Sequence, residues 1–71
     1  MSILTNLTGE LRRIAGQLYP AARTDSDQLR ALVNAEHDLR AERLTAAANQ
    51  LRDAARRQGR PALVRRLDEL V

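Results

Sequence analysis

Apolar residues recur at steps of three and four along most of the chain, which is the spacing of helices that bury one face. The first such segment has its apolar positions at Leu4, Leu7, Leu11, Ile14, Ala15 and Leu18. Ser2 is a suitable N-cap, and Pro20 disfavours helical backbone at the residue before it. We therefore predict a helix over residues 3–19, with a kink at Gly9 and a close approach of a neighbouring helix at Gly16.

A second helix is predicted over residues 25–36. Thr24 and Asp27 have the spacing of a capping box, with Asp in place of the usual Glu. The acidic residues of this first turn also suit the positive end of the helix dipole. We expect its buried stripe to consist of Leu29, Leu32 and Val33.

The end of the second helix is less sharply marked. No Gly or Pro occurs between Ala21 and Gln58, so a single long helix is one alternative. Continuing the stripe of the second helix by helical steps, however, leads to Glu36 and Arg40, where the apolar face is lost. We therefore predict a turn near residues 36–40, with Leu39 in the core.

Two further helices are predicted over residues 40–58 and 61–70. The third would bury Leu44, Ala47, Ala48, Leu51, Ala54 and Ala55. Gly59 then suits the position just after a helix, and Pro61 the first position of the next one. The fourth would bury Leu63, Val64, Leu67 and Leu70.

The pattern predicts one all-α domain over residues 1–71, a small antiparallel bundle of four to five helices, five if Gly9 divides the first. Composition agrees, because Leu and Ala number twelve each among 71 residues and Tyr19 is the only aromatic residue. We expect one core, formed by Leu7, Leu11, Ile14, Leu18, Leu29, Leu32, Val33, Leu44, Leu51, Leu63, Val64 and Leu67.

The residue types argue against an enzyme and against a site for a metal, a cofactor or a small molecule. The chain has no cysteine and one histidine, His37. Its acidic neighbours, Glu36 and Asp38, would point about 100° away from it on a helix, so the three do not converge on a metal. No apolar run exceeds three residues and no signal peptide is recognisable, so we expect no membrane contact and a cytoplasmic location.

Charge is the most informative feature, and all twelve basic residues are arginine. Residues 24–38 carry four carboxylates and one arginine, whereas residues 39–66 carry eight arginines and two carboxylates. Pairs within helices, such as Asp53–Arg57 and Arg65–Glu69, account for part of this. The remainder predicts two complementary faces: an acidic one of Asp25, Asp27, Glu36 and Asp38, and an arginine-rich one of Arg52, Arg56, Arg57, Arg60, Arg65 and Arg66.

Three segments also resemble a known family: LYP at 18–20, AEHDL at 35–39 and AARRQGRPALV at 54–64. They are similar to the bacterial effector-associated domains, death-fold-like helical modules related in shape to caspase-recruitment domains. The resemblance implies an adaptor that couples a sensor to an effector in bacterial antiviral defence. It also implies homotypic association, so the expected partner is another copy or a homologous domain.

The alternative is a small DNA-binding protein. Residues 25–58 would then form a helix-turn-helix, with Arg40 and Arg43 near the start of the recognition helix. A net charge of +3 is low for a nucleic-acid surface, and Asp25 and Asp27 would repel phosphate. The sequence therefore favours a protein partner.

Overall fold

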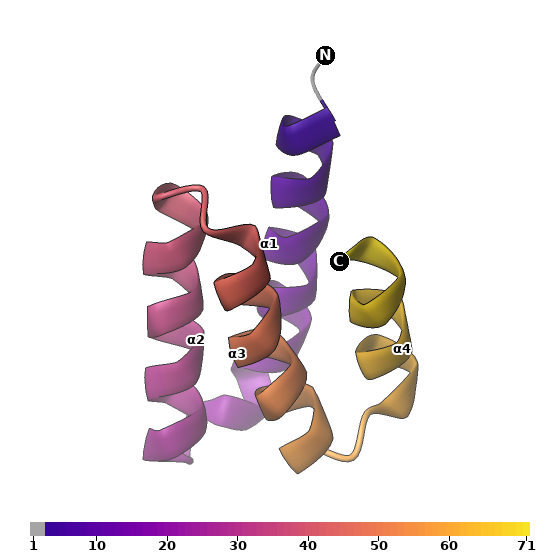
Figure 1. The fold of residues 1–71 in the computed structure, drawn as a ribbon. Coiled ribbons are helices and arrows are strands. Elements are labelled where there is room, and N and C mark those ends of the chain that lie inside the picture. The colour runs from indigo at the N-terminus through magenta and orange to yellow at the C-terminus, as the bar shows by residue number, and fades with distance from the viewer. Residues whose placement is uncertain (1–2) are drawn as a thin grey trace.

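The computed structural model describes residues 3–71, with side chains from Asn6 onward, and this part of the chain forms four helices. They are α1 (Ile3–Ala22), α2 (Ser26–Arg40), α3 (Leu44–Arg57) and α4 (Pro61–Leu70). Successive helices run in opposite directions, as Figure 1 shows. The prediction of a small all-helical bundle is confirmed. The expected N-cap, Ser2, lies outside the described residues.

Helix α1 is longer than predicted and is not divided at Gly9. Its expected end at residue 19 is wrong, because Pro20 lies inside the helix and Ala22 is its last residue. A proline costs a helix the bond to the carbonyl four residues earlier, but the last turn can be held by other contacts. Ala22 is fully buried, and the carbonyl of Leu18 accepts a hydrogen bond from the side chain of Gln58.

The close approach expected at Gly16 is absent from the described part of the chain. A Cβ atom added at Gly16 would have no neighbour within 4 Å, and the same holds at Gly9. Both positions are exposed. Neither glycine is therefore needed for the packing of α1 against another helix.

Helix α2 begins with Asp25 as its N-cap, one residue later than the predicted cap at Thr24. Asp25 has extended backbone angles, and its Oδ1 accepts hydrogen bonds from the backbone N–H groups of Asp27 (3.0 Å) and Gln28 (3.1 Å). Its Oδ2 accepts a third from Gln28 Nε2 at 2.9 Å. The capping box from Thr24 to Asp27 is wrong, since Asp25 itself supplies the cap.

The buried face of α2 is rotated from the predicted one. It consists of Gln28, Ala31, Leu32, Ala35 and Leu39, a regular helical series. Leu32 and Leu39 are in the core as expected, whereas Leu29 is only half-buried and Val33 is 42% exposed. Because this face continues past residue 36, the predicted turn at 36–40 is wrong: α2 runs to Arg40. The second and third helices are separate, as predicted, but the turn lies at residues 41–43 and α3 begins at Leu44 rather than Arg40.

Helix α3 ends as its sequence predicts. Gly59 has φ = 66°, in the left-handed region that glycine adopts readily. Its N–H donates to the carbonyl of Arg56 (3.1 Å), and the next N–H, of Arg60, donates to that of Ala55 (2.9 Å). This pair of bonds is the Schellman motif. Pro61 then occupies the first turn of α4, as expected.

Helix α2 ends in the same motif without a glycine. Glu42 has φ = 60°, and its N–H donates to the carbonyl of Leu39 at 3.1 Å. The N–H of Arg43 donates to the carbonyl of Asp38 at 2.8 Å. A glutamate thus occupies the position that Gly59 fills at the end of α3, which is why no local signal marked this turn.

The core lies around α3, which contacts each of the other three helices. The largest fully buried side chains of the core come from all four helices and are Leu11, Leu18, Leu32, Leu39, Leu51 and Leu67. Alanines fill the spaces between them, at Ala22, Ala35, Ala47, Ala48, Ala54 and Ala55. Small side chains of this kind let helix axes approach closely. Of the predicted core, Ile14 is buried, Leu7, Leu44, Leu63 and Val64 are partly buried, and Val33 lies outside the core.

Candidate interaction surface

A groove of about 440 Å³ lies where the chain leaves α3 and enters α4. We call it the α3–α4 groove, and its lining residues are Arg56, Gly59, Arg60, Pro61, Val64, Arg65 and Asp68. Pro61 and Val64 contribute apolar surface, whereas three arginines contribute positive charge. The turn around Gly59 brings the arginines together, because it places the last turn of α3 beside the first turns of α4.

Two of these arginines have no partner in the described part of the chain. Arg56 and Arg65 are exposed, and neither makes a hydrogen bond or an ion pair with a residue of that part. Arg60 is held in place, since its NH1 donates to the backbone carbonyl of Gln17 at 2.9 Å. The groove therefore presents three guanidinium groups, none of which pairs with a carboxylate of the described residues, and the carboxylate in its lining, Asp68, pairs with Arg52.

The other three arginines of the predicted cluster pair with carboxylates of the same chain. Arg52 joins α3 to α4, since its Nε lies 2.8 Å from Asp68 Oδ1 and its side chain is only 18% exposed. Arg57 pairs with Asp53 at 3.3 Å, which confirms the predicted pair. The six predicted arginines thus divide into three at the groove and three whose charge is already balanced.

Arg66 is the third of the paired arginines. Its NH1 lies 3.2 Å from Glu69 Oε2, and its NH2 lies 3.8 Å from Glu10 Oε1. The contact with Glu10 links α4 to α1. The predicted partner of Glu69 was Arg65, and that prediction is wrong. Arg66 is the residue that reaches Glu69, and Arg65 is left facing the groove.

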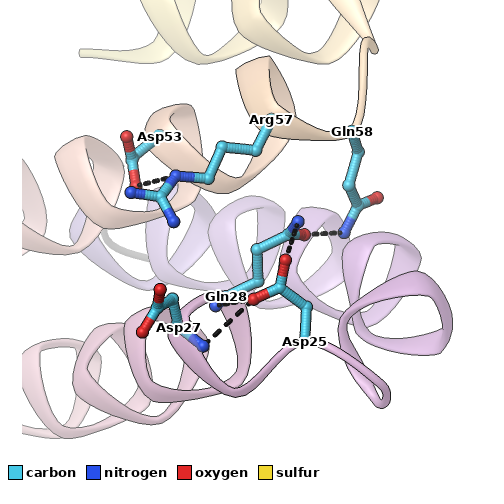
Figure 2. Close-up of polar contacts among 6 residues, drawn as sticks. All are labelled: Asp25, Asp27, Gln28, Asp53, Arg57 and Gln58. Carbon is cyan, nitrogen blue, oxygen red and sulfur yellow. Dashed lines mark hydrogen bonds and ion pairs between the residues drawn. The ribbon is translucent and has the colours of Figure 1, made fainter.

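The four residues of the predicted acidic face lie at two ends of α2. Asp25 and Asp27 belong to its beginning, where Figure 2 shows the Asp25 carboxylate turned toward Gln28 and the start of the helix. Hydrogen bonds from the Gln28 backbone, the Gln28 side chain and the Asp27 backbone, with a smaller effect of the Arg57 charge, lower the pKa of Asp25. This carboxylate is therefore occupied by capping.

Glu36 and Asp38 lie near the other end of α2, and eleven helical residues, or about 16 Å, separate Asp38 from Asp27. Glu36 accepts a hydrogen bond from Arg40 Nε, and Asp38 one from Arg43 Nε, each at 3.1 Å. The structure thus does not bring the four acidic residues together. Their role in an interface stays a prediction.

The same contacts bear on the DNA-binding alternative. Arg40 is the last residue of α2 and Arg43 precedes α3, so neither lies within the helix that would enter a groove of DNA. Both guanidinium groups are held by carboxylates of α2. A contact of either side chain with DNA would therefore have to replace a carboxylate partner that it already has.

Sequence reasoning missed one charged residue, Glu42. It is exposed, and its carboxylate has no hydrogen-bond or ion-pair partner within residues 3–71. It lies at the turn between α2 and α3, where the neighbouring acidic residues are paired. Only its left-handed backbone distinguishes it, and the sequence carries no signal for that conformation.

His37 is exposed on α2. In the described part of the chain, no three His, Asp or Glu side chains gather in a way that would hold a metal ion. Over the same residues, none of the helices combines the length and the apolar character needed to cross a membrane. The α3–α4 groove therefore remains the feature from which a function is best argued.

Comparisons with known proteins do not identify a function for this chain. No family model matches this chain, and no curated protein or solved structure is significantly similar to it. The resemblance to bacterial effector-associated domains accordingly stays a prediction from three short sequence segments. What the chain does has to be inferred from its charges, its groove and its turns.

Proposed function

We propose that this chain is a protein-interaction module that associates with another copy of itself or with a homologous domain. The α3–α4 groove of one copy receives an acidic group of the next, from the turn that follows α2. The observation that carries the proposal is that Arg56 and Arg65 are exposed beside an apolar groove and have no acidic partner in the described part of their own chain.

The chemistry of the groove suits a carboxylate on a protein. A guanidinium group offers paired N–H donors that match the two oxygens of a carboxylate, and such charged hydrogen bonds are stronger than neutral ones. Pro61 and Val64 offer apolar surface whose burial adds to the affinity. A partner that supplies both an acidic group and a small apolar surface fits this groove better than a phosphate backbone alone.

Within this proposal, the bundle is a death-fold-like adaptor that couples a sensor to an effector in bacterial antiviral defence. The support for this finer statement is the resemblance carried by residues 18–20, 35–39 and 54–64. Co-purification of this chain with an unlabelled homologous domain, but not with an unrelated helical bundle of equal charge, tests it.

The experiment for self-association compares two double variants by sedimentation velocity over a range of protein and salt concentrations. Arg56→Glu with Arg65→Glu reverses the two unpaired arginines of the groove. Arg12→Glu with Arg30→Glu is the matched control, because both of these arginines are exposed and the net charge changes equally. We expect the control to associate like the wild type and the groove variant to be monomeric.

Salt supplies a second criterion. Association through exposed charges weakens as ionic strength rises, since the screening length falls to about 8 Å at 0.15 M. A wild-type chain that stays monomeric throughout, or a control that loses association as fully as the groove variant, contradicts the proposal. Loss of heparin or DNA retention without any change in self-association would favour the nucleic-acid alternative.

A further inference from the structure

Glu42 occupies a backbone conformation that glycine adopts more easily. Its φ of 60° is close to the 66° of Gly59, and both residues stand at the same place in a Schellman motif. Side chains other than glycine are disfavoured in this left-handed region. Residues held in such conformations concentrate at functional sites. The chain thus carries a carboxylate at a position whose backbone conformation glycine adopts more easily.

The surroundings of Glu42 leave its charge uncompensated. Glu36 is paired with Arg40 and Asp38 with Arg43, so these four residues cancel one another. Glu42 is exposed on the three-residue turn that joins α2 to α3, and no residue of the described chain pairs with it. Within the described residues, the α2–α3 turn therefore presents one carboxylate without a partner, that of Glu42.

The groove and this turn lie at opposite ends of α3. The helix has fourteen residues, or about 21 Å of length. Figure 1 shows the α2–α3 turn at the top and the α3–α4 connection at the bottom of the bundle. Glu42 therefore cannot reach the groove of its own chain, and a contact between the two would have to join two copies.

We infer that the carboxylate of Glu42 enters the α3–α4 groove of the next copy, where it accepts hydrogen bonds from the guanidinium groups of Arg56 and Arg65. This inference rests on the proposed function and names the acidic group that it requires. Because the two surfaces differ, the contact is heterologous: each copy offers one turn and one groove, and the association is head to tail. It continues into rings or filaments unless one surface is blocked.

Three single variants test which carboxylate is used. Glu42→Gly removes the carboxylate and relieves the backbone, so it raises the melting temperature and weakens self-association. Glu42→Gln weakens self-association without that gain in melting temperature. Asp27→Asn is the control, since it also removes one exposed carboxylate but lies at the other end of α2. For both Glu42 variants we expect the dissociation constant to rise at least about tenfold.

A mixing experiment tests the head-to-tail geometry. Glu42→Arg blocks the turn of one chain, and Arg56→Glu with Arg65→Glu blocks the groove of the other. Each chain alone is expected to be monomeric. Their mixture is expected to form a 1:1 dimer that grows no further, because only one intact turn and one intact groove remain. A mixture that stays monomeric, or that forms larger species, overturns the geometry.

The outcomes separate this inference from the proposed function. A wild-type chain that never associates refutes both. If the wild type associates and reversal of Arg56 and Arg65 prevents it, but Glu42→Gly associates normally, the inference alone is refuted. Misfolding does not confuse the result, because Glu42→Gly is expected to be more stable than the wild type and its melting curve checks this directly.

Discussion

The side-chain amide of Gln58 donates a hydrogen bond to the backbone carbonyl of Leu18, forty residues earlier, at a distance of 2.8 Å. The same Nε2 lies 2.9 Å from Gln28 Oε1, and Gln28 Nε2 donates in turn to Asp25 Oδ2. Figure 2 shows the part of this network that joins Asp25, Gln28 and Gln58. It ties the ends of α1 and α3 to the start of α2, next to the turn that forms the α3–α4 groove.

The first prediction concerns this network. Gln58→Ala should lower the free energy of unfolding by about 1–3 kcal/mol, because it removes the donor to two part-buried acceptors, Gln28 Oε1 and the carbonyl of Leu18. Gln17→Ala is the control, since the Gln17 side chain is exposed and only its backbone carbonyl is used. Urea denaturation of the three proteins measures the difference. Equal midpoints for Gln58→Ala and Gln17→Ala would show that the network adds no stability.

The second prediction compares the two Schellman motifs. Glu42→Gly should raise the free energy of unfolding by about 0.5–1 kcal/mol, and Gly59→Ala should lower it by a similar amount or more. A Cβ atom at Gly59 would meet no neighbour within 4 Å, so the effect there comes from the backbone alone. Opposite shifts of the thermal midpoints are the expected result. Shifts of the same sign would contradict this account of the turns.

The end of α3 and the start of α4 could be predicted because their signals are local. Gly59 and Pro61 mark the α3–α4 turn by their own residue types. The turn at Glu42 could not be predicted, since a glutamate there carries no sign of a left-handed backbone. The continuation of α1 through Pro20 likewise has no local signal, and carbonyl groups near this end of the helix accept hydrogen bonds from Gln58 and Arg60, which are remote in sequence.

The face of α2 was misjudged for a different reason. The prediction followed the large apolar side chains, but the helix buries Gln28, Ala31 and Ala35 and leaves Val33 exposed. Ala31 and Ala35 are buried because other helices pack against them, and Gln28 is buried with a hydrogen-bond partner at the end of α3, Gln58. These contacts between helices cannot be identified from a single sequence. The same reason applies to the candidate site. Arg52 pairs with Asp68 across two helices, and because the sequence does not show this contact, the prediction counted too many arginines as unpaired.

The third prediction tests the observed core. Leu51 is fully buried at the centre of α3, and Leu51→Ala should lower the free energy of unfolding by about 2–5 kcal/mol. Val33→Ala should change it by less than about 0.5 kcal/mol, because Val33 is an exposed position. Thermal melting followed by circular dichroism distinguishes the two. A large effect at Val33 with a small one at Leu51 would mean that α2 and α3 present other faces to the core.

The last prediction concerns pH. Asp25 caps α2, and its hydrogen bonds to Gln28 and Asp27 hold the pKa of its carboxyl below the ordinary value. A carboxyl whose pKa is lower in the folded state stabilises the fold fully above its unfolded pKa of about 3.9. That contribution is lost as the pH falls below about 4 and through the folded pKa.

Asp25→Asn isolates this effect, because asparagine is also a good N-cap but does not titrate. We expect the wild type to melt at a higher temperature than Asp25→Asn at pH 7, and the gap to close as the pH falls from about 4 toward 2. The other carboxylates are present in both proteins, so the difference between them reports Asp25. A gap that stays constant from neutral to strongly acidic pH would show that the hydrogen bonds of Asp25 do not favour its ionised form.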